Sequence, residues 1–288
     1  MDARQVSLTR AAELRPYLRS IGFTPSKSLG QNFLVDANMR DLILDASRVG
    51  PSDTAIEIGP GLGVMTEGLL QRARAVTAIE LDARLVDHLR QRFGGHSTLT
   101  LRHQDATTVP WATETRPDPV RIVSNLPYSV GSRVLYDLAA PGIEPLSITV
   151  MVQRDVADRL LAEPGGELYG LLSVRMQRAF QIQRVRNVPG NCFLPAPRVG
   201  SSVVHLSRHP QPPPPLYDPA AFEALVKFAF TRRRKQLQAI LRDGGYPPAD
   251  CGIDLQRRPE TLSPGEWAQL ANALPSAPSK KDTSEEVP

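Results

Sequence analysis

The stretch Thr54-Ala55-Ile56-Glu57-Ile58-Gly59-Pro60-Gly61-Leu62-Gly63 decides the fold class of this chain. An apolar β-like run leads into a glycine loop, and a helical pattern follows over 65–74, which is the context that a nucleotide-type loop requires. A dinucleotide fingerprint would place its last glycine at position 64, where Val64 stands. The tighter spacing fits a ligand whose backbone lies close across the turn, since glycine has no Cβ atom. Taken alone, the loop fits a ligand-free turn equally well.

Downstream of this loop, β-like runs alternate with helical stretches. The predicted strands cover 54–58, 75–80, 99–103, 120–124 and 147–152, and the predicted helices include 65–74 and 83–93. Strands that alternate with helices form a parallel sheet covered on both faces, so we expect an α/β fold. A further run, Val203–Leu206, is predicted as a late edge strand.

Changes in residue composition along the chain predict how it divides into domains. A proline-rich segment resembles a stiff extended linker, and the residues after it are helical in pattern, most clearly over 220–230 and 233–241. The end of the chain is rich in proline, serine and charge, which is typical of disorder. The predicted parts are an N-terminal extension (1–24), a catalytic domain (25–208), a linker (209–217), a helical C-terminal domain (218–274) and a disordered tail (275–288).

Composition excludes several classes of protein. The 288 residues are 41% hydrophobic and 22% charged, as in a soluble globular protein, and the net charge of +4 permits nucleic-acid binding without requiring it. No run approaches the roughly 18 apolar residues of a membrane span. Cys192 and Cys251 have no metal or redox spacing, and the five histidines have no metal-ligand spacing. We therefore expect a cytoplasmic protein without a metal.

Acidic residues stand at the ends of two predicted strands, where ligands bind in open parallel sheets. Glu80 lies about 20 residues past the glycine loop, the position of a carboxylate that accepts hydrogen bonds from ribose hydroxyls. Asp82 competes for this role, but strand alternation favours Glu80. Asp105, after the third strand, can accept a hydrogen bond from an adenine amino group. Each acid alone also fits a solvated strand end or a helix cap, but together with the loop they favour S-adenosylmethionine as the ligand.

The turn Asn125-Leu126-Pro127-Tyr128 closes the fourth predicted strand. The Asn125 side-chain carbonyl and the Leu126 backbone carbonyl can accept the two hydrogens of an amino group on a flat ring, and the Tyr128 ring can lie on that base. These are the contacts that methylation of an exocyclic amine needs. Asn and Pro are also common in ordinary turns that end strands.

Six motifs in order carry a family resemblance: Lys27–Leu34, Glu57–Gly63, Ile79–Asp82, Gln104–Ala106, Asn125–Tyr128 and Phe193–Val203. They closely resemble the ribosomal RNA adenine N6,N6-dimethyltransferase family, in particular its bacterial small-subunit (KsgA/RsmA-type) members. The resemblance implies a Rossmann-like S-adenosylmethionine-dependent methyltransferase domain with a smaller all-helical C-terminal domain. It further implies that the acceptors are two adjacent adenosines near the 3′ end of 16S rRNA in a pre-30S subunit, with a role in 30S maturation. We expect the enzyme to act as a monomer.

The resemblance also assigns site residues. The predicted cofactor-binding residues are Asn32, Leu34, Gly59, Gly61, Glu80, Asp105 and Asn125, and the predicted catalytic residues are Asn125, Leu126, Pro127 and Tyr128. Asn125 is expected to lie between the cofactor and the target amine. Tyr128 and Phe193 are expected to stack on the two faces of the target base, although core packing is the alternative for Phe193.

Clusters of arginine are the candidate RNA contacts. Six arginines and no acidic residue lie between Leu168 and Tyr217, and Arg198 stands within the Phe193 motif. Arg232, Arg233, Arg234 and Lys235 form a second cluster, predicted to open a helix and equally well explained as a solvated helix face.

Two other functions remain open at this point. One is the related large-subunit methyltransferase of the macrolide-resistance type. The other is a ribosome-assembly or transcription factor on the same fold without catalysis, which would be expected to have lost its cofactor residues. Gly59, Glu80 and Asp105 are all present, which favours catalysis.

Overall fold

The computed structural model describes residues 6–26, 28–115, 119–211, 213–247 and 250–274. The chain divides into two compact units. The first contains the residues up to Leu161 together with Phe180–Arg208, and the second contains Ala162–Ala179 together with the residues from His209 onward. The sequence-based division assigned 162–179 to the catalytic domain, whereas these residues belong to the second unit. It also set 1–24 apart as an extension and 209–217 as a linker, which belong to the first and the second unit, respectively. The predicted disordered tail, 275–288, lies outside the described residues.

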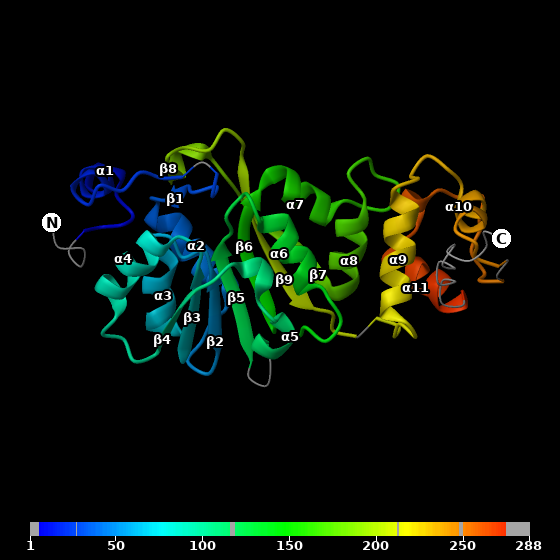
Figure 1. Cartoon of the computed structure of the whole chain (residues 1–288), viewed down its shortest axis with the longest axis horizontal. Coiled ribbons are helices and arrows are strands. Elements are labelled where there is room, and N and C mark those ends of the chain that lie inside the picture. The colour runs from blue at the N-terminus through cyan, green and yellow to red at the C-terminus, as the bar shows by residue number, and fades with distance from the viewer. Residues whose placement is uncertain (1–5, 27, 116–118, 212, 248–249, 275–288) are drawn as a thin grey trace, which may run out of the picture. The chain divides into compact units, whose positions relative to one another are not determined.

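A seven-stranded sheet forms the centre of the first unit (Figure 1). Its order is β4-β3-β2-β5-β6-β9-β7, and a second, two-stranded sheet pairs β1 with β8. The strands are β1 (Phe33–Leu34), β2 (Thr54–Ile58), β3 (Ala75–Glu80), β4 (Leu99–His103), β5 (Val120–Asn125), β6 (Ser147–Gln153), β7 (Phe180–Val188), β8 (Phe193–Leu194) and β9 (Ser201–Arg208). The five strands from β2 to β6 pair in parallel, as the alternation of strands and helices predicts.

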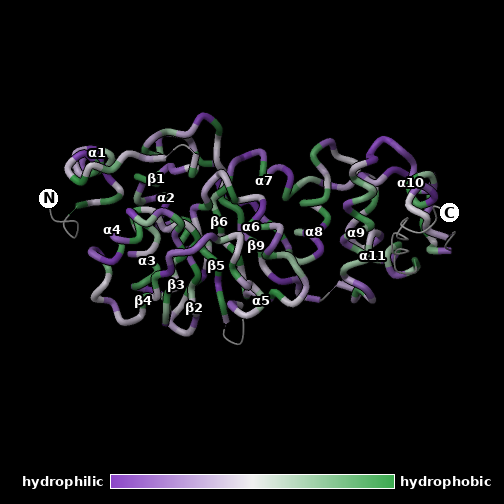
Figure 2. Tube along the Cα trace, in the orientation of Figure 1, coloured by the Kyte–Doolittle hydropathy of each residue, from purple (hydrophilic) through white to green (hydrophobic). Residues whose placement is uncertain are grey.

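The helices are α1 (Ala11–Ser20), α2 (Ala37–Ser47), α3 (Val64–Arg72), α4 (Ala83–Phe93), α5 (Trp111–Glu114), α6 (Gly131–Leu138), α7 (Arg154–Leu161), α8 (Leu171–Ala179), α9 (Pro219–Phe230), α10 (Leu237–Asp243) and α11 (Pro264–Ala273), with short 3₁₀ turns η1 (Ala106–Thr108), η2 (Gly190–Cys192) and η3 (Pro259–Thr261). The described part of the second unit contains helices and loops but no strand, and its core is built around the fully buried Trp267. Hydrophobic stretches concentrate along the central strands of the first unit (Figure 2). A strand that is covered on both faces buries nearly all its side chains, so nearly all of its residues are apolar.

The far edge of the sheet differs from the sequence-based prediction. The predicted late edge strand is β9, and it lies inside the sheet because β7 pairs with it on the outer side. Both β7 and β9 run antiparallel to their neighbours. The sequence reading missed β7, whose arginine and glutamine residues alternate with apolar ones, the pattern of a strand with one solvated face.

The N-terminal helix α1 is part of the packed first unit. Leu14 and Tyr17 are buried, with 0% and 1% of their surface exposed. The Tyr17 hydroxyl is hydrogen-bonded to Nδ1 of His88 on α4 at 2.9 Å. A buried hydrogen bond and an apolar face together hold this helix in a fixed place on the unit.

In the second unit, the helix predicted over 233–241 begins only at Leu237. Residues 231–235 form a turn in which Arg232 N–H donates to the Ala229 carbonyl. Arg233 holds this turn in place, since its guanidinium donates to the backbone carbonyls of Gly166 and Glu167 at 2.9 and 2.7 Å.

Candidate active site

A pocket opens at the carboxyl ends of β2, β3 and β5 in the first unit. It encloses about 950 Å³ of empty space including its open mouth. Five stretches far apart in the sequence line it: 29–34, 57–65 without Gly63, 79–81, 104–106 and 125–130. Every predicted cofactor-binding residue is among its lining residues, and so are the four residues of the Asn125–Tyr128 turn.

The glycine loop turns tightly between β2 and α3. Gly59, Gly61 and Gly63 have φ angles of +66°, +61° and +92°, in the region that only glycine adopts readily. A Cβ atom on Gly59 would lie 2.7 Å from Cγ of Pro127, closer than atoms can approach without movement. The loop is therefore packed directly against the Asn125–Tyr128 turn, which places the two halves of the predicted site side by side.

Glu80 lies at the end of β3 beneath this loop. One carboxylate oxygen accepts hydrogen bonds from the backbone N–H groups of Leu81 and Asp82, both at 2.9 Å, and the other accepts one from Gly61 N–H at 3.0 Å. Burial raises the pKa of Glu80, and these three donors oppose that effect. A carboxylate has about four acceptor positions, so the carboxylate of Glu80 both fixes the loop and keeps capacity for one further donor from the pocket.

Asp105 caps the short turn η1 with one oxygen only. That oxygen accepts hydrogen bonds from the backbone N–H and the hydroxyl of Thr107, both at 2.8 Å. The second carboxylate oxygen has no donor among the described residues. Asp105 therefore presents an acceptor at the pocket wall.

Asp82, the competitor of Glu80, does not line the pocket. It caps α4 and binds Arg84, which is the main reason that its pKa is lowered to about 2. It also accepts a hydrogen bond from the side chain of Gln31 at 2.9 Å, which fixes the segment that leads to β1. Asp82 thus has a structural role at this end of the sheet.

The Asn125 side chain has a defined orientation. Its Nδ2 donates to the backbone carbonyl of Asn32 at 3.1 Å, so the amide nitrogen faces the N-terminal segment and Oδ1 is left as the acceptor. The Asn32 side chain in turn donates to the Gly30 carbonyl at 3.1 Å. The Leu126 carbonyl, the second predicted acceptor, receives no hydrogen bond from the described residues. The turn therefore offers two carbonyl oxygens whose hydrogen-bonding capacity the fold does not use.

The Tyr128 ring is held by its hydroxyl, which is hydrogen-bonded to the hydroxyl of Ser201 at the start of β9. Burial raises the pKa of the Tyr128 phenol, so it stays neutral at physiological pH. The sequence reading did not single out Ser201, although it lies in the quoted Phe193–Val203 motif.

The sequence-based prediction also missed a third carboxyl group in the pocket, beside Glu80 and Asp105. Glu57 in β2 lines the pocket with only 1% of its surface exposed, and its carboxyl accepts a hydrogen bond from the Thr66 hydroxyl at 2.6 Å. Burial raises its pKa to about 8, and the nearby charge of Glu80 adds to this. An acid inside an otherwise apolar strand was the available signal, because a carboxyl group is seldom fully buried without a specific environment.

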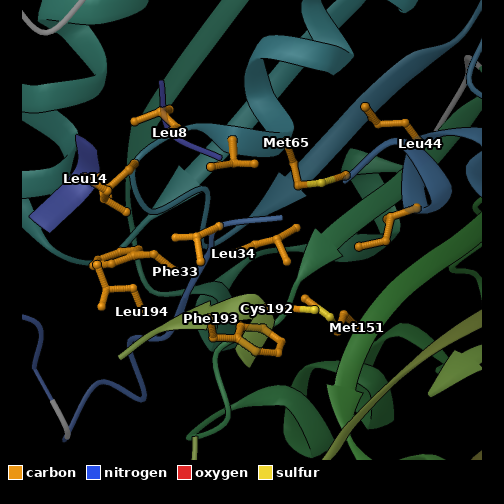
Figure 3. Close-up of a cluster of buried hydrophobic side chains, with 14 of the residues drawn as sticks. Leu8, Leu14, Phe33, Leu34, Leu44, Met65, Met151, Cys192, Phe193 and Leu194 are labelled. Carbon is orange, nitrogen blue, oxygen red and sulfur yellow. The ribbon is translucent and has the colours of Figure 1, made fainter. Parts of the chain in front are cut away.

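Phe193 does not lie where the stacking prediction requires it. Its side chain is 4% exposed and belongs to the hydrophobic cluster of the first unit, near Cys192 and Met151 (Figure 3). It lines neither the pocket nor the neighbouring groove. The structure favours the alternative of core packing for Phe193, because β8 pairs with β1 and the ring lies in the hydrophobic cluster.

Most of the arginines between Leu168 and Tyr217 bind other parts of the protein. Arg175 pairs with Glu223 in the second unit, and Arg184 pairs with Asp158 in the first. Arg178 and Arg208 donate to backbone carbonyls. This segment is therefore a weaker candidate for RNA contact than its charge alone indicates.

In the second cluster, Lys235 pairs with Asp243, and Arg232 lies over the Phe228 ring at 3.8 Å from its centroid. Arg234 is exposed and has no partner among the described residues. Of this predicted RNA-binding cluster, Arg234 is thus the residue most available to a ligand.

No group of three or more His, Cys, Asp or Glu side chains among the described residues is arranged to hold a metal ion. No helix in the same residues has the length and apolar character needed to cross a bilayer.

Comparison with known proteins connects this geometry to a family. The model of the ribosomal RNA adenine dimethylase family matches residues 22–274. A ribosomal RNA small subunit methyltransferase A from Bacillus cytotoxicus is 38% identical over 269 residues, covering 88% of this chain and 92% of the relative. The protein of the same name from Clostridium perfringens is 36% identical over 282 residues, covering 95% and 98%.

Solved structures show the same fold. A dimethyladenosine transferase from Plasmodium falciparum superposes with a TM-score of 0.68 at 22% identity, covering 82% of this chain and 95% of that one. The 23S rRNA methyltransferase ErmE superposes with a TM-score of 0.60 at 26% identity, covering 84% and 99%. The pocket, the Asn125–Tyr128 turn and a family match that spans both units lead to one conclusion: this chain belongs to the ribosomal RNA adenine dimethylase family.

Proposed function

We propose that the protein transfers methyl groups from S-adenosylmethionine to the N6 amines of two adjacent adenosines near the 3′ end of 16S rRNA, within an immature small ribosomal subunit. The observation that carries this proposal is the orientation of Asn125. Because its Nδ2 is committed to the Asn32 carbonyl, its Oδ1 is available to accept a hydrogen from an amine. A second acceptor, the Leu126 carbonyl, follows in the same turn.

The cofactor side of the pocket fits an adenosine ligand. The unpaired oxygen of Asp105 would accept from the adenine amino group, and Glu80 would accept from one ribose hydroxyl with its remaining capacity. Gly59 and Gly61 would lie against the methionine part, where a side chain would block approach. Asn32 and Leu34 would contact the ligand from the segment around β1. Bound here, S-adenosylmethionine supplies a methyl carbon that is already electrophilic because it is attached to a sulfonium.

The acceptor side would activate the amine by position. The nitrogen lone pair of adenine N6 is delocalised into the ring, which makes the amine a poor nucleophile. Hydrogen bonds to Asn125 Oδ1 and the Leu126 carbonyl would draw the nitrogen toward tetrahedral geometry and localise that lone pair. The Tyr128 ring, held by Ser201, would cover one face of the base. Orientation of this kind supplies much of the acceleration without a strong base.

Proton transfer needs no separate catalytic base in this scheme. Methyl transfer would break the S–CH₃ bond, form the N–CH₃ bond and release S-adenosylhomocysteine as a neutral thioether. The nitrogen is then cationic and acidic, so its proton passes readily to water. For the second methylation, the monomethyl amine binds with one hydrogen on a carbonyl acceptor and its methyl group in place of the other hydrogen. Tyr128, neutral and hydrogen-bonded, is suited to packing on the base.

Small subunits are favoured over large subunits as the substrate because the small-subunit relatives are 36–38% identical to this chain, whereas the 23S rRNA enzyme ErmE is 26% identical. The test uses purified protein, labelled S-adenosylmethionine, and 30S or 50S particles from cells that lack each modification. We expect N6,N6-dimethyladenosine in 16S rRNA and none in 23S rRNA. Label in 23S rRNA alone would assign the large-subunit activity, and label in neither would favour a non-catalytic assembly factor.

A further inference from the structure

A groove adjoins the acceptor turn in the first unit and has no assigned role. It encloses about 1990 Å³ of empty space including its open side. One part of its lining comes from α1 and the segment 23–25, and another comes from the turn 194–199. Gln31, Asn32 and Tyr128 line both this groove and the cofactor pocket. The groove is therefore continuous with the place where the target amine would bind.

The charged side chains that line the groove are all positive. Arg15, Arg19 and Arg198 line it, and no aspartate or glutamate is among its lining residues in the part of the chain that the structure describes. All three arginines are exposed, and none of them forms an ion pair with a described carboxylate. This arrangement contrasts with Arg184 and Arg233, which bind other parts of the protein.

The arginines of α1 are held in position by the fold. Arg15 and Arg19 are four residues apart, so they lie on the same face of the helix. The other face is buried through Leu14 and Tyr17, and the Tyr17 hydroxyl ties the helix to His88. Because the helix is held in place, binding has to order only the side chains of Arg15 and Arg19 and not their backbone, which costs less entropy than ordering a mobile tail.

We propose that this groove binds the single-stranded RNA on either side of the target adenosine, with Arg15 and Arg19 of α1 and Arg198 contacting successive phosphates. The inference rests on the proposed function and adds the path of the substrate strand. A base that reaches the Asn125–Tyr128 turn must leave its stack, so the nucleotides next to it are unpaired at that point. Positively charged grooves that follow the backbone are the usual way of holding such strands. On this view α1 is part of the substrate-binding surface.

The test compares the wild-type protein with Arg15→Gln/Arg19→Gln on 30S particles that lack the modification. Each phosphate contact to a single strand contributes about 0.7 to the salt slope, so the double variant should lose about 1.4 from the slope of log(kcat/KM) against log[salt]. We expect kcat/KM at moderate salt to fall about tenfold or more while kcat at saturating 30S changes less than about twofold. Affinity for S-adenosylmethionine, measured by calorimetry, should be unchanged because neither arginine lines the cofactor pocket.

Arg72→Gln/Arg90→Gln is the matched control. It removes the same charge from exposed ion pairs with Asp45 and Asp87, and neither arginine lines the groove or the pocket. If the two double variants have equal salt slopes, only net charge matters and the groove proposal is wrong. If the wild type methylates no RNA, the proposed function fails; if it does so and Arg15→Gln/Arg19→Gln matches it, only the groove proposal fails.

Short RNA oligonucleotides separate the possible occupants. Binding of an unpaired RNA should weaken in Arg15→Gln/Arg19→Gln, while binding of a blunt duplex of the same length should not. Equal losses for both RNAs would overturn the assignment to single-stranded RNA. Normal oligonucleotide binding together with weakened 30S binding would mean that the groove holds a ribosomal protein, which also overturns it.

Discussion

Replacing Glu57 with glutamine should change how the stability of the first unit depends on pH. Glu57 is 1% exposed, and burial raises the pKa of its carboxyl to about 8 from an ordinary value of 4.5. Between these two values the folded protein holds a proton that the unfolded chain has released. The unfolded state then binds fewer protons than the folded state, so the free energy of unfolding falls as the pH rises. Above about pH 8 the folded protein would have to bury a charge.

The magnitude follows from the width of this interval. Each pH unit corresponds to 1.36 kcal/mol, so the full effect between pH 4.5 and 8 is on the order of 5 kcal/mol. Glu57→Gln keeps the size of the side chain and an oxygen that can accept from the Thr66 hydroxyl, but it cannot ionise. The variant should differ from the wild type by less than about 1 kcal/mol at pH 5 and be more stable by about 3–5 kcal/mol at pH 8.5.

The assay is urea unfolding followed by tryptophan fluorescence. The chain has two tryptophans. Trp111 lies in the first unit and Trp267 in the second, so a Trp267→Phe background makes the signal report the first unit. Subtracting the two pH profiles removes the contributions of all other titrating groups. A stability difference that stays constant from pH 5 to 8.5 would refute the assignment of a neutral buried carboxyl at Glu57.

Three other predictions concern single contacts. Ser201→Ala should lower kcat/KM about three- to tenfold with little change in melting temperature, because the Tyr128 hydroxyl loses its hydrogen-bond partner. Tyr128→Phe should lower kcat/KM by the same factor. If the double variant shows no further loss, the hydrogen bond between the two hydroxyls is the cause. Gly63→Ala should destabilise the first unit by more than about 2 kcal/mol in thermal unfolding, since the new Cβ atom would lie 2.3 Å from the Phe93 ring of α4. Gly95→Ala is the control and should be nearly neutral, because its Cβ atom would have no neighbour within 4 Å. Equal losses of stability in the two variants would contradict this explanation. Arg233→Ala should destabilise the second unit by about 1–3 kcal/mol, because it removes the donor of the Glu167 carbonyl and one of the two donors of the Gly166 carbonyl, which keeps only Tyr169 N–H. Normal stability in denaturant would argue against this role.

The sequence predicts well which residues meet at the glycine-loop side of the pocket, because each feature there is local. The glycines of the loop need positive φ angles that few other residues adopt, and Glu80 and Asp105 stand at strand ends that periodicity locates. Parallel strands bring their carboxyl ends to one edge, so groups at these ends meet without any further information. The loop and the acids were for that reason visible as one site before the fold was known.

Other features depend on contacts between distant segments. Phe193 is placed in the core by the pairing of β8 with β1, about which its own neighbours in sequence say nothing. Arg233 binds carbonyls of residues 166 and 167, so its charge alone suggested a surface role that its contacts do not support. The orientation of Asn125 depends on a carbonyl 93 positions away. Such partners become known only when the tertiary structure is known.

Methyl transfer by Asn125→Ala tests the central claim most directly. Purified wild type and variant are given saturating labelled S-adenosylmethionine and 30S particles that lack the modification, and N6,N6-dimethyladenosine in 16S rRNA is measured together with binding of both ligands. Loss of a positioned hydrogen-bonding group at the reacting atom costs about 10²–10³ in kcat, so we predict a fall of that size with 30S affinity retained. Wild-type methyl transfer by Asn125→Ala would contradict the proposal that this side chain positions and activates the amine.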